Sequence, residues 1–328
     1  MILSLLLGTA SIGLPAERKR ATPRAERSPS YDTAAINDPQ THEDVKPESS
    51  GSSVVRIQIL LDRAHFSPGE IDGKYGDNLR VALEGYQSSH KLPVSGFGDA
   101  ETWQSLSADT APALVPYTIT AEDVSGPFEK IPTDMMEQAK LEHLGYQSPE
   151  DALGERFHIS SALLTRLNPG KNLGNAGEQT LVPNVERNNT VPADKVVVSK
   201  SRRTVTAFAA DGTLLAQYPA TMGSEHDPLP IGKWKIVGVQ QNPVFYYNPN
   251  LFWDAKAEDS KARIAPGPRN PVGVVWISLS KEHYGIHGTP DPSKIGHTES
   301  HGCIRLTNWD AEELSKIVKP SVPAILEE

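Results

Sequence analysis

Residues 284–308 read YGIHGTPDPSKIGHTESHGCIRLTN, and the rest of the chain is organised around this stretch. It contains the only cysteine of the 328-residue chain, Cys303, together with three histidines. A single cysteine with histidines nearby is a candidate nucleophile and base. Gly302, directly before the sulfur, leaves room for main-chain N–H groups to face a developing oxyanion. His287 follows an apolar residue and precedes Gly288, so a strand ending there would direct the imidazole toward a neighbouring loop.

The order of residues in this stretch resembles a known signature. A His-Gly pair, a spacer containing Pro and Gly, and then Ser-His-Gly-Cys-Ile-Arg is similar to the pattern of the L,D-transpeptidases of bacterial cell walls, the YkuD-type enzymes. His287 and Cys303 lie 16 positions apart (303 − 287), which fits that pattern. The resemblance covers roughly the last 130 to 140 residues, about the size of one domain, and we assign residues 192–328 to it.

The resemblance implies a role for individual residues of the motif. Cys303 would be the nucleophile and His287 its base, with the carbonyl of Gly288 holding the second imidazole nitrogen. The N–H groups of Gly302 and Cys303 are the candidate oxyanion hole. A free thiol has a pKa near ~8.5, and we expect a neighbouring imidazolium to lower it. The candidate substrate contacts are His301, Arg305, Ser300 and Tyr284.

Arg305 is the substrate contact with the clearest chemical reason. Its guanidinium lies two residues after the candidate nucleophile and offers a planar fork that matches a carboxylate. Peptidoglycan stem peptides carry several carboxylates. The predicted reaction is attack of Cys303 on the third residue of a stem tetrapeptide, release of D-alanine, and transfer of the thioester to an acceptor amine. The resemblance implies no cofactor or metal, and it implies sensitivity to carbapenems, which acylate the same sulfur.

The composition limits the class of protein. A formal net charge of −9 gives no electrostatic support for a nucleic-acid partner. One cysteine excludes an intramolecular disulfide, and in an exported protein it indicates a reactive thiol. The length suits two or three domains. The expected partners are peptidoglycan stem peptides and glycan, in the periplasm or elsewhere in the cell envelope.

The N-terminal stretch predicts export. Residues 1–16 contain an apolar run typical of a signal peptide, too short for a stable membrane span, although the usual basic residues before it are missing. Residues 17–53 are first basic and then acidic and rich in Ser and Pro, with too few apolar residues for a core, so we expect a disordered linker. A basic cluster within them could contact anionic polymer, but a solvated tether is the simpler interpretation.

Residues 54–109 predict a small module of three helices. Leu79, Ala82, Leu83 and Tyr86 recur at helical spacing, and Gly- and Asp-containing turns separate the helices. The segments IQILL, GEIDGKYG and SGFGDAETWQSL resemble the peptidoglycan-binding-type-1 module. We expect this module to tether the enzyme to the polymer and to raise the local substrate concentration.

Residues 110–191 are expected to connect the two domains. Ala111–Pro116 suggests a linker, Asp134–Leu144 an amphipathic helix, and residues 148–167 one or two more. The end of this segment resembles the close of a LysM glycan-binding repeat. We therefore expect a helical connector with a degenerate LysM-like end.

From residue 192 the pattern becomes β. Runs of β-branched residues and an Asp211-Gly212 turn predict a hairpin, and residues 308–318 predict one helix with Asn308 as its N-cap. The expected fold class is therefore multi-domain α+β, with a C-terminal mainly-β sandwich that carries one helix. Residues 240–271 form a long Pro- and aromatic-rich stretch, equally compatible with a lid and with a packed loop.

Three alternatives stay open at this level. The histidines and Cys303 contain enough ligand types for zinc, although no standard zinc spacing occurs. The chain could instead be a non-catalytic scaffold that binds the wall through its N-terminal module. Within the enzyme interpretation, the acceptor could be another stem peptide, water (an L,D-carboxypeptidase), a lipoprotein lysine or a D-amino acid. The sequence also leaves the oligomeric state open.

Overall fold

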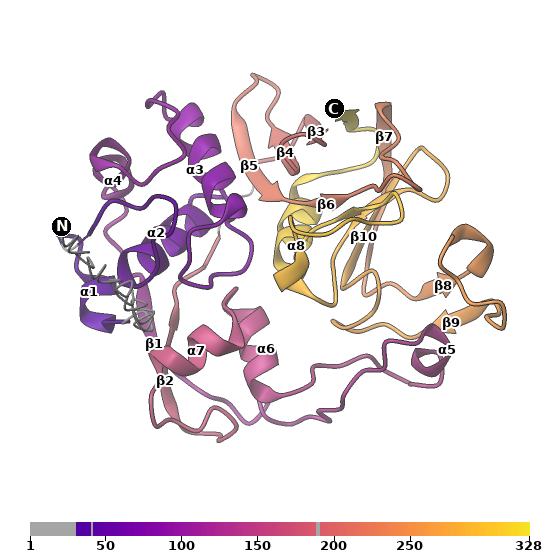
Figure 1. The fold of residues 1–328 in the computed structure, drawn as a ribbon, viewed down its shortest axis with the longest axis horizontal. Helices are drawn as coiled ribbons and strands as arrows, with labels where there is room; N and C mark the ends of the chain where they lie inside the picture. Colours follow the sequence, from indigo (N-terminus) through magenta and orange to yellow (C-terminus); the bar gives the residue numbers. More distant parts are fainter. Residues whose placement is uncertain (1–30, 41, 188–190) are drawn as a thin grey trace, which may run out of the picture.

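The computed structural model describes residues 31–40, 42–187 and 191–328 (Figure 1). The expected signal peptide at residues 1–16 and the basic cluster lie outside the described residues. Within the described ranges, none of the helices combines the length and apolarity needed to cross a bilayer.

The N-terminal region is helical, as its periodicity predicts. Leu79, Leu83 and Tyr86 are buried on one face of their helix and pack with Trp103 in a common core. Asp99 caps the last helix by accepting a hydrogen bond from the N–H of Thr102. The helices are α1 (Thr33–Asn37), α2 (Ser52–Arg63), α3 (Asp77–Ser89) and α4 (Ala100–Leu106).

The described part of the predicted linker 17–53 is ordered, which differs from the expectation. Ile36, on α1, and Val45 are both fully buried. Val45 bridges to Gly98, and the indole of Trp103 donates to the carbonyl of Glu43. Ile36 and Val45 each fill a core built mainly by other segments, so local composition underestimates the contribution of this stretch to packing.

The middle of the chain forms a unit of two strands and two helices. Its elements are β1 (Leu114–Thr118), α6 (Pro149–Arg156), α7 (Ser161–Leu167) and β2 (Gln179–Pro183), and β1 pairs antiparallel with β2. The expected linker at Ala111–Pro116 is therefore partly a strand. The sequence analysis did not predict this strand, because Pro116 weakens a strand prediction. In addition, the pairing partner of β1 lies some sixty residues later in the chain. The expected helix at Asp134–Leu144 is reduced to α5 (Met135–Gln138).

Residues 119–148 leave this unit and run along the lower edge of the molecule in Figure 1 to the C-terminal domain. There Leu144 packs with Tyr247 and Ile264 in a separate small core. These partners belong to the hairpin of β8 (Phe245–Tyr247) and β9 (Ala262–Ile264). The segment 240–271 also contains the short helix η1 (Pro249–Leu251). It is thus packed and internally hydrogen-bonded.

The C-terminal domain is built on one sheet of nine strands in the order β5-β4-β3-β13-β7-β10-β11-β12-β6. The strands are β3 (Lys195–Ser199), β4 (Thr204–Phe208), β5 (Leu214–Pro219), β6 (Thr221–Met222), β7 (Gly232–Gln241), β10 (Val275–Leu279), β11 (Gly285–His287), β12 (Ile304–Arg305) and β13 (Pro323–Glu327). The short helix η2 (Pro292–Lys294) and α8 (Asn308–Ile317) complete the domain.

This sheet corrects the expected two-sheet sandwich. Its two edge strands, β5 and β6, are separated in the chain by Ala220 alone. Opposite edges that are one residue apart must lie together, so the sheet curves into a nearly closed barrel. Alternation of buried and exposed residues predicts strands but does not say whether they form two sheets or one curved sheet. The predicted hairpin is present as β4–β5, with Gly212 at φ +86° in its turn.

The helical module is docked on edge strand β5 of the C-terminal sheet. Gln217 on edge strand β5 donates its N–H to the carbonyl of His65 (2.9 Å) and accepts from the N–H of Ser67 (2.9 Å). Its side chain donates to the carbonyl of Val81 on α3 (2.9 Å). The module therefore satisfies main-chain groups that an exposed edge strand would leave unpaired.

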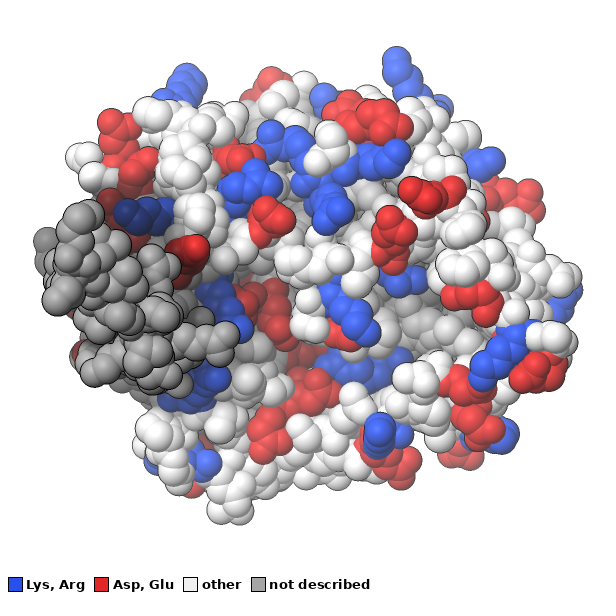
Figure 2. All heavy atoms as spheres, viewed as in Figure 1, with Lys and Arg blue, Asp and Glu red and all other residues white. Residues whose placement is uncertain are grey.

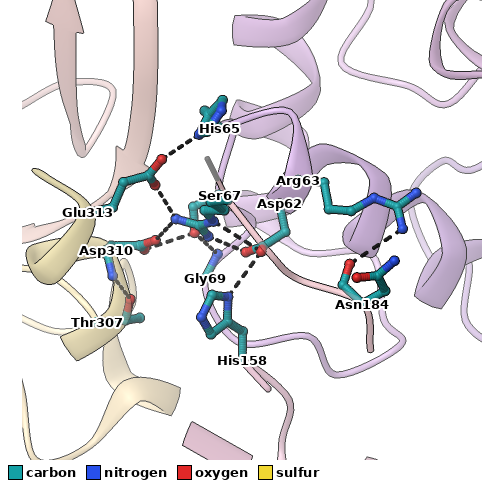
Figure 3. A network of polar contacts seen from close by, with 11 residues as sticks. Asp62, Arg63, His65, Ser67, Gly69, His158, Asn184, Thr307, Asp310 and Glu313 are labelled. Carbon is teal, nitrogen blue, oxygen red and sulfur yellow. Dashed lines mark hydrogen bonds and ion pairs between the residues drawn. The ribbon is translucent and has the colours of Figure 1, made fainter. Parts of the chain in front are cut away.

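A buried polar network lies at this interface (Figure 3). Arg187 forms ion pairs with Asp62 on α2 and with Asp310 and Glu313 on α8. His158 also binds Asp62 (3.0 Å), and the side chain of Arg187 is only 6% exposed. Arg187 thus joins the helical module to the C-terminal domain from a position in the middle of the chain.

Candidate active site

The two halves of the motif lie on neighbouring strands. β11 and β12 pair in parallel, with Ile286 opposite Ile304 and His287 opposite Arg305. Cys303 directly precedes β12, so this register places it beside Gly285, two positions before His287. Because residues two apart on a strand point to the same face, His287 and Cys303 are diagonal neighbours on one face of the sheet, within reach of each other's side chains.

His287 is buried and held in one orientation. Its Nδ1 lies 2.7 Å from the carbonyl oxygen of Gly288. A carbonyl can only accept a hydrogen bond, so Nδ1 carries the proton and Nε2 is left as the basic nitrogen. Burial, together with the positive charge of Arg305, lowers the pKa of His287 to about 3. The imidazole is therefore neutral at physiological pH, and Trp276 stacks on it.

Cys303 directs its thiol at a main-chain carbonyl. Its Sγ donates to the carbonyl oxygen of His283 (3.6 Å), and no hydrogen bond joins Sγ to His287 among the described residues. Burial raises the pKa of Cys303, while the N–H of Gly285 and the guanidinium of Arg305 act in the opposite direction. The directions of the two shifts favour a neutral thiol and a neutral imidazole over the expected thiolate–imidazolium pair, because the surroundings of both groups disfavour their charged forms.

The loop before the sulfur is fixed by Ser300 and Gly302. The hydroxyl of Ser300 donates to the carbonyl of Cys303 (2.6 Å) and accepts from the N–H of Gly223 (2.8 Å). Gly302 has φ +91°, and a Cβ at this position would lie 2.9 Å from the ring of Tyr284. The turn therefore needs glycine both for its backbone conformation and for space.

Arg305 is a half-buried cation with donor capacity to spare. Its Nε has no hydrogen-bond partner, and no carboxylate within the described ranges lies at ion-pair distance from its guanidinium. Burial lowers the pKa of Arg305, whereas Cys303 and Asp254 act to raise it. An unpaired guanidinium next to the sulfur is suited to an anionic group of a ligand.

His301 connects the motif to the long segment 240–271. Its Nε2 lies 2.8 Å from Oδ1 of Asp254, and the rings of Phe252 and Trp253 pack on it at 5.0 and 5.9 Å. Its Nδ1 is buried without a partner among the described side chains. The segment therefore covers the second motif histidine with two aromatic residues and one carboxylate.

Asn308 is a positioning residue that the sequence analysis missed. Its Oδ1 accepts from the N–H groups of Val274 (3.2 Å) and Thr289 (3.1 Å), and its Nδ2 donates to Glu155 (2.6 Å). It thereby holds the turn after His287. The N-cap of α8 is Thr307 rather than Asn308. Capping propensity could not separate the two, since both residue types are good N-caps.

The other histidines lie away from these contacts. The side chains of His283 and His297 are exposed, although the carbonyl of His283 accepts the thiol hydrogen bond. In the part of the chain that the structure describes, no group of three or more His, Cys, Asp or Glu side chains has the arrangement of a metal site.

Comparison with known proteins finds matches for both the N-terminal and the C-terminal regions. The profile of the YkuD family, "L,D-transpeptidase catalytic domain", matches residues 193–326, and that of "Putative peptidoglycan binding domain" matches residues 50–106. The "Putative L,D-transpeptidase YkuD" of Bacillus licheniformis is 34% identical over 170 residues, which are 51% of this chain and 87% of that protein. Its Bacillus subtilis counterpart is 32% identical over 169 residues, with the same shares covered.

A solved structure of L,D-transpeptidase 3 from Mycobacterium tuberculosis, in complex with a faropenem-derived adduct, aligns with a TM-score of 0.35 and 18% identity. The alignment covers 49% of this chain and 78% of that one.

Proposed function

The chain belongs to the YkuD family of L,D-transpeptidases, and from this premise we propose that it acts on peptidoglycan with Cys303 as nucleophile and His287 as base. The observation that carries the proposal is the pairing of β11 with β12, which brings the two residues to one face of the sheet. We place the enzyme in the cell envelope, where its substrate lies.

The first half-reaction forms a thioester. Sγ of Cys303 attacks the carbonyl carbon of the third residue of a stem tetrapeptide while its proton moves to Nε2 of His287. The new S–C bond gives a tetrahedral oxyanion, for which the N–H groups of Gly302 and Cys303 are the donors. When the C–N bond to D-alanine breaks, His287 returns the proton to the leaving amine.

The second half-reaction uses the same groups in reverse. An acceptor amine attacks the thioester carbonyl and gives a proton to His287, and the sulfur leaves and is protonated again. The hydrogen bond from Nδ1 to Gly288 supports both steps, since it keeps Nε2 directed at the reacting atoms. The low pKa of His287 supports a neutral pair that transfers its proton during the attack.

Substrate binding falls to the groups that surround the sulfur. Arg305 receives a stem-peptide carboxylate, because its buried Nε lacks a partner within the described structure. Tyr284 and His301 line the same region. For Ser300 the contacts favour a positioning role, since its hydroxyl is engaged by Cys303 and Gly223.

Residues 240–271 can restrict access to the site. Phe252, Trp253 and Asp254 all contact His301, while the β8–β9 hairpin behind them packs on residues 131–144. These contacts support a covering segment that is anchored by the β8–β9 hairpin. Its residues 252–254 lie against His301 of the motif.

Product analysis tests the proposal. Purified protein is incubated with a disaccharide-tetrapeptide, and the products are read by mass spectrometry. We expect loss of D-alanine and a cross-linked dimer; hydrolysed tripeptide alone would instead identify an L,D-carboxypeptidase. A lipoprotein-anchoring enzyme would transfer the tripeptide only when a lysine-bearing acceptor is added. No turnover with any acceptor would favour a non-catalytic scaffold.

The ionisation of Cys303 gives a second test. We expect its alkylation by iodoacetamide to increase with pH through a single midpoint above the ordinary thiol range, because burial raises the pKa of Cys303. Arg305→Gln should move that midpoint higher still, since the guanidinium favours the thiolate. A rate that is already at its plateau near neutral pH would show a thiolate–imidazolium pair and contradict the neutral pair inferred here.

A further inference from the structure

A cavity of about 290 Å³ lies between the helical module and the catalytic sheet. One wall comes from the first turn of α3, with Asn78 and Arg80, and the opposite wall from the β3–β4 turn, with Arg202 and Arg203. Gly296, in the spacer of the motif, is also part of the lining. On the face seen in Figure 2, Lys and Arg side chains gather over β5 and β6, beside α3.

The cavity, here called the interdomain cleft, is locally basic in an acidic protein. Arg80 and Arg202 share one carboxylate, Glu84, at 2.7 and 3.2 Å, and Arg80 also contacts the exposed Asp77. No carboxylate in the described ranges pairs with Arg203. Three guanidinium groups therefore face two partly exposed carboxylates, which leaves the cleft with net positive charge.

The cleft also borders the catalytic motif directly. Arg203 donates to the carbonyl of Gly296 (2.8 Å), and Asn78 donates to the carbonyl of Ile295 (2.8 Å). Gly296 in turn donates its N–H to the hydroxyl of Thr221 (2.9 Å) on β6, the strand that pairs with β12. The spacer between His287 and Cys303 is thus held from both domains at the floor of the cleft.

We propose that the interdomain cleft binds free carboxylate groups of peptidoglycan stem peptides. These stem peptides are neighbours, on the polymer, of the stem peptide that is held in the active site. This inference rests on the proposed function and extends it to a second contact with the polymer. Guanidinium groups match carboxylates in planar geometry, and the cleft opens between the module that matches a peptidoglycan-binding domain and the catalytic domain. A single peptidoglycan chain can therefore contact both domains at once, which increases the effective concentration of substrate at the sulfur of Cys303.

The test separates binding of the polymer from chemistry. The double variant Arg80→Gln/Arg202→Gln removes two cleft cations. It leaves unchanged Arg203 and Asn78, which donate hydrogen bonds to the motif spacer. Arg166→Gln, an exposed arginine on α7 outside the cleft, is the matched control. Binding is measured by co-sedimentation with purified sacculi freed of phosphate polymers, and turnover is measured on a soluble disaccharide-tetrapeptide.

We expect the double variant to bind sacculi roughly tenfold more weakly, since each exposed ion pair is worth up to about fivefold in affinity. Its turnover of the soluble peptide should equal that of the wild type, and Arg166→Gln should match the wild type in both assays. Amidation of the wall carboxylates should abolish the difference between the wild type and the double variant.

Two results would overturn the inference. Unchanged binding of the double variant to sacculi would show that the cleft takes no carboxylate. A defect that occurs only with walls retaining their phosphate polymers would assign the cleft to phosphate instead. Failure of the proposed function would be seen separately, as absence of turnover by the wild type on the soluble peptide.

Discussion

Replacing Cys303 with alanine is expected to abolish acyl-enzyme formation, with turnover at least ~10⁴-fold below that of the wild type, the scale of loss when a catalytic nucleophile is removed. No other cysteine is available to take over, since the chain contains one. Intact-protein mass spectrometry after incubation with a carbapenem or a stem tetrapeptide should show no added mass.

The control for this variant comes from the same spacer. His297→Ala removes an exposed side chain and should stay within about twofold of wild-type turnover, as surface changes usually do. Circular dichroism should show that Cys303→Ala is folded, because a small side chain replaces a small one. Acylation of Cys303→Ala at the wild-type rate would refute the assignment of the nucleophile.

Replacing Arg187 with alanine is expected to lower the free energy of unfolding by about 3–5 kcal/mol, the cost of breaking a buried ion pair from one side. The change would leave Asp62, Asp310 and Glu313 close together without their shared cation. A loss of this size is a large share of the ~5–15 kcal/mol that holds a typical domain folded. Urea unfolding monitored by tryptophan fluorescence measures it.

An exposed ion pair provides the matched control. Lys171 pairs with Glu178 at 2.8 Å with both side chains partly exposed, so Lys171→Ala should cost no more than ~1 kcal/mol. If Arg187→Ala were as mild as Lys171→Ala, the network would not hold the module to the catalytic domain.

The effect of Arg187→Ala should depend on pH in a defined direction. Burial alone would raise the pKa of Asp62, but Arg187 and His158 bring it down to about 2. In the wild type this carboxylate therefore stabilises the fold above its ordinary pKa of 3.8, and the contribution is lost as the pH falls through about 2. Without Arg187, burial would raise the pKa of these acids and they would protonate on mild acidification. The stability difference should thus be largest near neutral pH and smaller in acid.

The local signals in the sequence predicted several elements well. Helical spacing placed α3, whose buried Leu79 and Leu83 form the module core. The Asp211-Gly212 turn placed the hairpin β4–β5. Such signals depend on a residue and its near neighbours, which explains why the same reasoning missed β1, whose partner β2 is distant in the chain.

The contact between the domains was not predicted from the sequence. Residues 17–53 were expected to be a disordered linker and residues 110–191 a helical connector, and no contact between the helical module and the C-terminal domain was expected. Instead Gln217 of β5 bonds to residues 65–67 of the module, and Arg187 joins three carboxylates from α2 and α8. Composition cannot identify such contacts, because each joins polar groups that would be equally suited to solvent.

By itself, the sequence determined the residues on which the proposed chemistry depends: a lone cysteine, a histidine sixteen positions before it, and a glycine next to the sulfur. These are properties of residue type and spacing, and they need no knowledge of the fold. Only the tertiary structure revealed the surroundings of the pair and the closure of the sheet. Burial lowers the pKa of His287 and raises that of Cys303, and the meeting of β5 with β6 closes the barrel. Both depend on segments distant in the chain, whose approach is fixed by packing rather than by any local pattern.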